Sequence, residues 1–432
     1  MARPLLPTKP ARELALLIGV QLQRQRAWAV QDSMDELALL TESAGADIAE
    51  RIVCKMDRPH PATFIGSGKA DELAARAKEA GVGLIVFDDD LTPVQGRNLE
   101  KIFGVKVIDR TQMILDIFAQ RARTREGRLQ VELAQADYML PRLRQEATLF
   151  GQQKGGIGLR GPGERQIELD RRRLQENITQ IRRDLDEVRL RRAELRRGRQ
   201  RQGWALFALV GYTNAGKSTL LNKLTGAEVF ANDQLFATLD PTTRKLTLPG
   251  KRAALLTDTV GFISKLPHHL VEAFQATLEE VIEADVLMHV VDVSHPRVDE
   301  QIEAVERVLA ELGVHDKPMI HVLNKIDLPA AAAQVTRLSA RLPRVAAVSA
   351  RTGEGLDDLL HLAADCLMHE RRLLKLRIPL AEAALLAKLR HQGQLQSERY
   401  DENFAHLVIT VPLALAEKLA DFEVKPAKSA KK

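Results

Sequence analysis

Apolar and polar positions along the first part of the chain predict strands separated by helices. Short apolar runs such as LALLIGV, LIVFDDD and VKVID are separated by stretches with helical spacing, among them SMDELALLTESAG and the segment after Thr92. Alternation of this kind is typical of a parallel sheet covered by helices, so we predict an N-terminal α/β domain over residues 1–128. Within it, FIGSGK superficially suggests a phosphate loop, but its glycines are too close together for the usual anion cradle, and entry into a helix explains them as well.

The pattern changes after Arg128 to two long helices. LQVELAQADYMLPRLRQEATLF predicts a helix with a kink or break at Pro141. The second helix, from Glu164 to Gly203, carries a coiled-coil seam formed by Leu174, Ile178, Ile181, Leu185, Val188 and Leu195. We predict an antiparallel hairpin over residues 129–203, with the loop 151–163 at its tip. The many arginines of the second helix form either a solvated face or a phosphate-contacting surface.

Two further regions complete the chain. Residues 204–370 again alternate strands and helices, which predicts a second α/β domain. Residues 371–432 suggest a small α+β module that ends in a basic tail. The expected fold is therefore α/β, with an N-terminal α/β domain, a long helical hairpin, a second α/β domain and a small C-terminal module.

Composition narrows the class of protein. The 432 residues include 63 Lys and Arg against 58 Asp and Glu, a net charge of +5, with ordinary proportions of hydrophobic residues. The two cysteines, Cys54 and Cys366, have no disulfide or zinc-ligand spacing, which favours a reducing compartment. No apolar run approaches the ~18–20 residues of a membrane span. We therefore expect a cytoplasmic protein without a membrane span, and we expect a monomer.

The most informative motif is a phosphate-binding loop. GYTNAGKS follows the apolar run ALFALV and opens a helical stretch, which is the setting that a G-x-x-x-x-G-K-S match requires. Its backbone N–H groups can bind phosphate oxygens, Lys217 can neutralise their charge, and Ser218 can bind Mg²⁺. The loop residues are Gly211, Tyr212, Thr213, Asn214, Ala215, Gly216, Lys217 and Ser218.

Further motifs follow in the order expected for a GTPase. After a strand, Asp258 can reach the Mg²⁺ shell and Gly261 can meet the γ-phosphate. After another strand, Asp327 can accept two hydrogen bonds from guanine, a pattern that adenine cannot reciprocate. A loop-borne Thr238 can complete the Mg²⁺ sphere. Each fragment alone is also compatible with a simple strand-end turn, but all of them in order predict GTP binding and disfavour a metabolic P-loop ATPase.

Together these motifs resemble the HflX family of ribosome-associated GTPases. The resemblance rests on GGIGLRGPGERQIELD, GYTNAGKST, FATLDPTTR, DTVGF and NKID, and it covers roughly residues 64–352. It implies the four-part fold above, a P-loop GTPase domain over residues 204–370, and hydrolysis of GTP to GDP and phosphate. It also implies binding to the large ribosomal subunit and its RNA, with a role in splitting or rescuing stalled ribosomes. The alternative that we retain is an RNA-binding ribosome-assembly factor that uses GTP as a timer.

The resemblance also implies roles for individual residues. Ser218 and Thr238 would ligate Mg²⁺, with Asp258 in its outer shell, and Lys217, Thr238 and Gly261 would act in hydrolysis. Two switch segments would contact GTP: Phe236, Ala237, Thr238, Leu239 and Asp240, then Asp258, Thr259, Val260 and Gly261. The base would be held by Asn324, Lys325, Ile326 and Asp327 together with Ser349, Ala350 and Arg351.

Three expectations concern the rate of hydrolysis, a cofactor and a partner. Phe262 stands where Ras-like enzymes have a water-orienting glutamine, so we expect slow intrinsic hydrolysis. Asn214 resembles the asparagine of potassium-activated GTPases, which makes K⁺ a second candidate cofactor beside Mg²⁺. The hairpin tip combines glycines with cations, and we predict that it binds ribosomal RNA. The residues concerned are Lys154, Gly155, Gly156, Gly158, Arg160, Gly161, Gly163 and Arg165.

Overall fold

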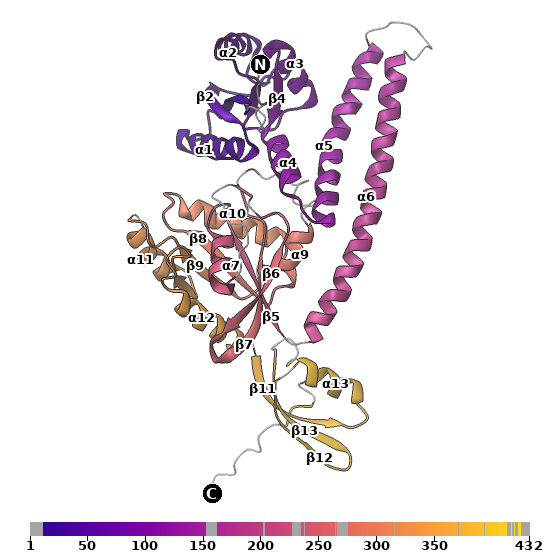
Figure 1. The fold of residues 1–432 in the computed structure, drawn as a ribbon, viewed down its shortest axis with the longest axis vertical. Coiled ribbons are helices and arrows are strands. Elements are labelled where there is room, and N and C mark those ends of the chain that lie inside the picture. Colours follow the sequence, from indigo (N-terminus) through magenta and orange to yellow (C-terminus); the bar gives the residue numbers. More distant parts are fainter. Residues whose placement is uncertain are drawn as a thin grey trace, which may run out of the picture. The chain divides into compact units, whose positions relative to one another are not determined.

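The computed structural model divides the chain into two compact units (Figure 1). It describes residues 12–152, 162–201, 204–226, 235–236, 238–263, 265, 275–314, 316–329, 331–369, 371–392, 394–412, 416, 419 and 422–424. Unit 1 comprises Met1–Asp186, Asn232–Asp240 and Ile263–Gln275, and unit 2 comprises Glu187–Ala231, Pro241–Phe262 and Ala276–Lys432. The second segment of unit 1 includes the predicted first switch, residues 236–240, whereas the predicted second switch, residues 258–261, belongs to unit 2.

Unit 1 contains the predicted N-terminal α/β domain, built on a parallel sheet of order β2-β1-β3-β4. Its elements are β1 (Leu14–Leu22), α1 (Ala27–Ala44), β2 (Asp47–Met56), α2 (Ser67–Glu79), β3 (Leu84–Phe87), α3 (Pro93–Phe103), β4 (Lys106–Asp109) and α4 (Arg110–Arg121). Leu16, Ile18, Ile85 and Phe87 lie in its buried core. Gly66, with φ 82°, precedes α2, which confirms that FIGSGK leads into a helix.

Two long helices form the hairpin, α5 (Arg125–Gln152) and α6 (Pro162–Arg201). Ile178, Ile181 and Leu185 are buried, which confirms the central part of the predicted seam. The alternative of a helix break at Pro141 is wrong, because α5 continues through this residue. The helix is held on both sides of the proline, since Tyr138 and Arg142 each donate a hydrogen bond to Asp109.

The hairpin loop is shorter than the sequence suggests. Gly151 still belongs to α5, and α6 begins at Pro162, whose fixed φ suits the first position of a helix. Gly163 is therefore helical in its backbone, and its assignment to the loop is corrected, whereas Arg165 lies in the second helix as predicted. The other predicted tip residues, Lys154, Gly155, Gly156, Gly158, Arg160 and Gly161, lie outside the described residues.

Unit 2 contains a six-stranded sheet of order β10-β9-β8-β5-β7-β6, in which only β6 is antiparallel to its neighbour. Its strands are β5 (Ala205–Gly211), β6 (Thr242–Leu248), β7 (Arg252–Asp258), β8 (Val286–Asp292), β9 (Met319–Asn324) and β10 (Val345–Ala347). Its helices are α7 (Lys217–Thr225), η1 (Pro249–Lys251), α9 (Gln275–Glu283), α10 (Val298–Glu311), α11 (Ala331–Arg341) and α12 (Leu356–His369). Phe207, Leu209, Met288 and Val322 lie in its buried core.

A three-stranded antiparallel sheet follows in unit 2, of order β11-β13-β12. It contains β11 (Arg371–Pro379), α13 (Ala383–Gln392), β12 (Gln394–Tyr400) and β13 (Phe404–Pro412), as expected for a small α+β module. The outer edge of β11 is paired, because Glu423 bridges to Leu376 and the Val424 N–H donates to the Lys375 carbonyl at 2.8 Å. Among the helices of the described ranges, none is long and apolar enough to cross a membrane.

Candidate nucleotide-binding site

The phosphate-binding loop lies at the carboxyl end of β5, in the centre of the six-stranded sheet (Figure 1). Parallel strands bring the loops after their carboxyl ends to one edge, where ligands bind in such sheets. Gly216 has φ 93° and caps the start of α7. A Cβ atom at Gly216 would overlap the Asn324 side-chain amide, so only glycine fits between these two motifs. Asn214 also has a positive φ, 60°, and its side chain is exposed.

Lys217 is buried inside this loop. Its Nζ donates to the carbonyl oxygens of Gly211 at 3.0 Å and Tyr212 at 2.8 Å. Burial lowers the pKa of Lys217 to about 8, although the charge of Asp258 acts in the opposite direction. The loop thus holds the ammonium group at its centre. Negatively charged phosphate oxygens bound there would stabilise the protonated form of Lys217 against the effect of burial.

The segment after β7 is held against the loop by backbone hydrogen bonds. The Thr213 N–H donates to the Phe262 carbonyl at 2.7 Å, and the Phe262 N–H donates to the Gly211 carbonyl at 3.1 Å. Gly261 has no room for a side chain, because a Cβ atom would lie 2.8 Å from Thr213 Cα and 3.0 Å from Lys217 Nζ. Gly261 therefore lies beside the phosphate-binding lysine, as the sequence motif requires.

Ser218 and Asp258 are direct neighbours. The Ser218 hydroxyl donates to Asp258 Oδ2 at 2.6 Å, and Asp258 is fully buried at the end of β7. Thr259 is turned away from this pair, since its hydroxyl donates to the Leu209 carbonyl at 2.6 Å.

The base-binding motifs meet at the ends of β9 and β10. Asn324 connects them to the phosphate loop: its amide donates to the Ala215 carbonyl at 2.8 Å, and its Oδ1 accepts from the Ala350 N–H at 2.9 Å. Asp327 accepts a hydrogen bond from the Ser349 hydroxyl at 2.7 Å. These contacts bring together residues from the motifs after three strands at one edge of the sheet.

Several predicted site residues belong to the other unit. Phe236, Thr238, Leu239 and Asp240 belong to unit 1, and Ala237 lies outside the described residues. The Phe236 ring and the Asp240 carboxylate make contacts there with the N-terminal part of the chain. Their predicted contacts with GTP stay a prediction, as does the Mg²⁺-binding role of Thr238.

Comparison with known proteins gives the family. Three family models match in order: a GTP-binding GTPase N-terminal region over residues 31–119, a GTP-binding GTPase middle region over residues 121–199, and a 50S ribosome-binding GTPase over residues 206–325. The curated GTPase HflX of Lacrimispora saccharolytica is 45% identical over 417 residues, which is 96% of this chain and 98% of that protein. The GTPase HflX of Escherichia coli is 43% identical, with 91% of this chain and 92% of that protein covered.

The chain belongs to the HflX family of GTPases. It therefore binds GTP and hydrolyses it, and the predicted P-loop GTPase fold is confirmed. The geometry around Ser218 fits the Mg²⁺ dependence that is general among GTPases, because a hydroxyl and a carboxylate are oxygen ligands that this ion prefers. Thr213 Oγ1 is buried and has no hydrogen-bond partner among the described residues. A polar group of a bound nucleotide could supply that partner.

Two residues that the sequence analysis did not single out lie next to predicted site residues of this HflX-family protein. Asp292, at the end of β8, forms an ion pair with Lys325 at 2.6 Å. Gly355, with φ 74°, leaves no space for a Cβ atom, which would overlap the Ala347 carbonyl. Asp292 could have been singled out from the sequence, because it stands at the end of an apolar strand, as Asp258 does.

His289 on β8 is fully buried. Burial, together with the charges of His321 and Lys217, lowers the pKa of His289 to about 3, so its side chain is neutral.

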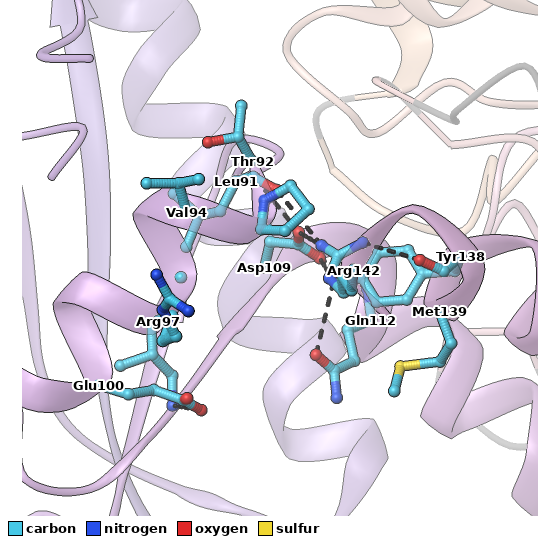
Figure 2. Close-up of a pocket in the computed structure, with 13 residues that line it drawn as sticks. Leu91, Thr92, Val94, Arg97, Glu100, Asp109, Gln112, Tyr138, Met139 and Arg142 are labelled. Carbon is cyan, nitrogen blue, oxygen red and sulfur yellow. Dashed lines mark hydrogen bonds and ion pairs between the residues drawn. The ribbon is translucent and has the colours of Figure 1, made fainter. Parts of the chain in front are cut away.

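Unit 1 of this HflX-family protein also contains a pocket of about 230 Å³ between α3, β4, α4 and α5 (Figure 2). Asp109 lies in its wall and accepts four hydrogen bonds, from Gln112 N, Tyr138 Oη, Leu91 N and Arg142 Nη2. The Arg142 guanidinium lies 3.3 Å from the centre of the Tyr138 ring. Burial raises the pKa of Asp109. With its acceptor positions filled, Asp109 ties helix α5 to the end of β4.

Proposed function

We propose that this GTPase binds the large ribosomal subunit in its GTP-bound form and acts there to split or rescue stalled ribosomes. The observation that carries the proposal is the match of residues 206–325 to a family model described as a 50S ribosome-binding GTPase. This function implies a cytoplasmic location. We also propose that the protein acts as a monomer.

The chain's own groups have defined roles in the proposed reaction. Backbone N–H groups of the loop from Gly211 to Ser218 bind the phosphates, and Lys217 neutralises their charge. Ser218 and Thr238 would hold Mg²⁺, with Asp258 in its outer shell. When bound, the ion would supply positive charge to the phosphates. The Gly261 N–H would donate a hydrogen bond to the γ-phosphate. When hydrolysis removes the γ-phosphate, the second switch segment would lose this contact and be released.

Hydrolysis in the isolated protein should be slow. Phe262, which follows Gly261, has no polar atom with which to orient a water molecule. We propose that K⁺ binds beside Asn214 and supplies charge to the phosphates, because this exposed side chain lies within the phosphate loop. The large subunit would supply the remaining stimulation.

The hairpin tip is the proposed RNA contact. Residues 151–163 include six glycines, and Lys154, Arg160 and Arg165 add positive charge to the same end of the hairpin. Ordering glycine costs conformational entropy, and a loop that only joins two helices has no need of so many glycines. Glycine does, however, allow a backbone to approach a partner closely. Cations beside such a backbone suit RNA phosphates.

Sedimentation of intact ribosomes tests the proposal. Ribosomes mixed with the protein and GTP should separate into subunits, with the protein on the large subunit when a non-hydrolysable GTP analogue is used, and GDP should fail. If intact ribosomes persist and only free large subunits bind the protein, the assembly-factor alternative replaces the proposal. The Asp327→Asn variant is the control: it should fail with GTP and regain activity with xanthosine triphosphate, which ties the effect to this site.

A further inference from the structure

The side chain of Lys325 lies along the sheet edge where the base-binding motifs and the phosphate-binding loop meet. Its Nζ forms an ion pair with Asp292 Oδ2 at 2.6 Å. Lys325 directly follows β9, Asp292 ends β8, and these two strands are parallel neighbours in which Asp292 pairs with Asn324. The aliphatic stem of the lysine therefore runs from the end of β9 towards the end of β8.

The strand order shows what lies on either side of this stem. In the order β10-β9-β8-β5, the base-binding motifs follow β10 and β9, and the phosphate-binding loop follows β5. A nucleotide whose phosphates bind this loop and whose base reaches Asp327 has to cross the end of β8. The methylene groups of Lys325 lie on this path, and they offer an apolar surface to the flat face of the base.

Asp292 is itself held in place by a local turn. Its Oδ1 accepts hydrogen bonds from the Ser294 N–H at 3.0 Å and from the Ser294 hydroxyl at 2.5 Å, which leaves Oδ2 for Lys325. The Asp292 side chain is 14% exposed and that of Lys325 is 27% exposed. Partly buried charge pairs are screened by salt much less than exposed pairs, so this contact fixes the lysine more firmly than a surface ion pair would.

The backbone of Lys325 is in a conformation that needs such support. Its φ is 68°, in the left-handed region that residues other than glycine rarely adopt. The Asn324 carbonyl accepts from the Val293 N–H at 3.2 Å, and the Lys325 carbonyl accepts from the Leu328 N–H at 3.1 Å. Strain of this kind persists where surrounding contacts hold it, and it is typical of ligand-binding sites.

Joining two strands is not enough to explain the ion pair. Strands β8 and β9 are already paired from Leu287 to Asp292, and an ion pair adds little stability to such a ladder. Its effect on Lys325 is more specific. Because the ammonium group is bound to Asp292, the stem is the part of the lysine that remains for a nucleotide.

We propose that Asp292 is a positioning residue for guanine: it holds the Lys325 stem against the face of the base, while Asp327 binds the edge of the base. The inference rests on the proposed assignment of residues 324–327 to the base. Without the Asp292 charge the lysine stem is free to move, and a nucleotide has to order it on binding. Ordering a long side chain costs conformational entropy, so affinity for any guanine nucleotide falls. A ligand that has phosphates but no base is unaffected.

The test is Asp292→Asn, which keeps an oxygen for Ser294 but removes the charge that binds Lys325. Dissociation constants for a fluorescent GTP analogue and for GDP are measured on the free protein with Mg²⁺, and inorganic tripolyphosphate is measured by competition. We expect both nucleotides to bind about tenfold more weakly, as is typical of coupling between contacting residues, and tripolyphosphate to bind as in the parent. In steady-state hydrolysis, KM should rise and kcat should stay the same.

Three further variants and a control separate positioning from a structural role. In a Lys325→Met background, which keeps an apolar stem without the charge, Asp292→Asn should add no further weakening. Asp292→Glu should recover part of the lost affinity. Ser294→Ala, which removes one of the two groups that orient the carboxylate, should weaken both nucleotides in the same way but less. Asp299→Asn, which removes a carboxylate paired with two arginines of α11, is the matched control and should change none of the dissociation constants.

Clear results would overturn the inference. These are nucleotide affinities of Asp292→Asn and Ser294→Ala within about twofold of the parent, equal weakening of tripolyphosphate, or an undiminished effect of Asp292→Asn in the Lys325→Met background. Asp327→Asn distinguishes the two levels of the proposal. If it leaves GTP affinity unchanged, the base assignment fails and the inference fails with it. If it weakens GTP binding while Asp292→Asn does not, only the inference about Asp292 is wrong. The assay contains no ribosome, so the proposed ribosomal function is tested separately.

Discussion

Replacing Asp327 with asparagine should change the base that this enzyme accepts. In the structure, the Ser349 hydroxyl donates to Asp327 Oδ1 at 2.7 Å, and Ser349 Oγ accepts from the Thr352 N–H at 3.1 Å. The single hydroxyl proton is thus directed at residue 327. In the Asp327→Asn variant the side-chain carbonyl keeps this hydrogen bond, and the amide NH₂ group turns towards the base.

The magnitude follows from the hydrogen bonds lost. Guanine would donate two hydrogen bonds to the carboxylate, and hydrogen bonds to a charged group contribute about 1.5–3 kcal/mol each. Their loss, about 3–6 kcal/mol, weakens GTP binding by about 10²- to 10⁴-fold. Xanthine has a carbonyl where guanine has its amine, so the turned NH₂ group can donate to it, and xanthosine triphosphate should bind better than GTP.

The assay is fluorescence titration with both nucleotides on parent and variant. Asp299→Asn provides the matched control, because Asp299 forms its ion pairs with Arg337 and Arg341 on α11 and should leave GTP affinity unchanged. A variant that binds GTP within about threefold of the parent would refute the assignment of Asp327 to guanine.

Four further predictions test other features. Hydrolysis by the protein alone should be slow, and it should rise with large ribosomal subunits and more in K⁺ than in Na⁺; equal rates in the two salts would remove the potassium proposal. Replacing Gly155–Gly161 with a short Gly-Ser linker should abolish ribosome-stimulated activity and leave GTP affinity unchanged, and the parent's affinity for the large subunit should fall as salt rises. Gly355→Ala should weaken GTP binding because its Cβ meets the Ala347 carbonyl, whereas Gly250→Ala, with the same φ of 74° and nothing within 4 Å, should not. Because His289 has a pKa of about 3 when folded and an ordinary value when unfolded, stability should fall as pH drops below about 6.5, by up to about 1.4 kcal/mol per unit, and His289→Asn should reduce this slope in a urea titration.

Sequence and structure agree most closely where short-range patterns fix the geometry. Each GTPase motif follows an apolar strand, and parallel pairing brings those strand ends together, so Gly261 lies beside Lys217 and Asn324 contacts the same loop. Strand β6 was not predicted because five of its seven residues, TTRKLTL, are polar, and only Leu246 and Leu248 are buried. The Asp240 contact depends on residues 116 and 117 positions away, and no local periodicity encodes such a pairing.

Edge pairing in the C-terminal sheet bears on how the protein avoids self-association. An unpaired strand edge can add a strand from another molecule and so start aggregation. Strand β12 is protected by a bulge near Leu395 and by the charged side chains Glu398 and Arg399. Strand β11 relies instead on Glu423 and Val424, which lie along its backbone, and its Leu373 side chain is 52% exposed. A chain shortened before Glu423 would therefore leave the edge of β11 unpaired and open to a strand of another molecule, and a purification tag is better attached beyond Val424.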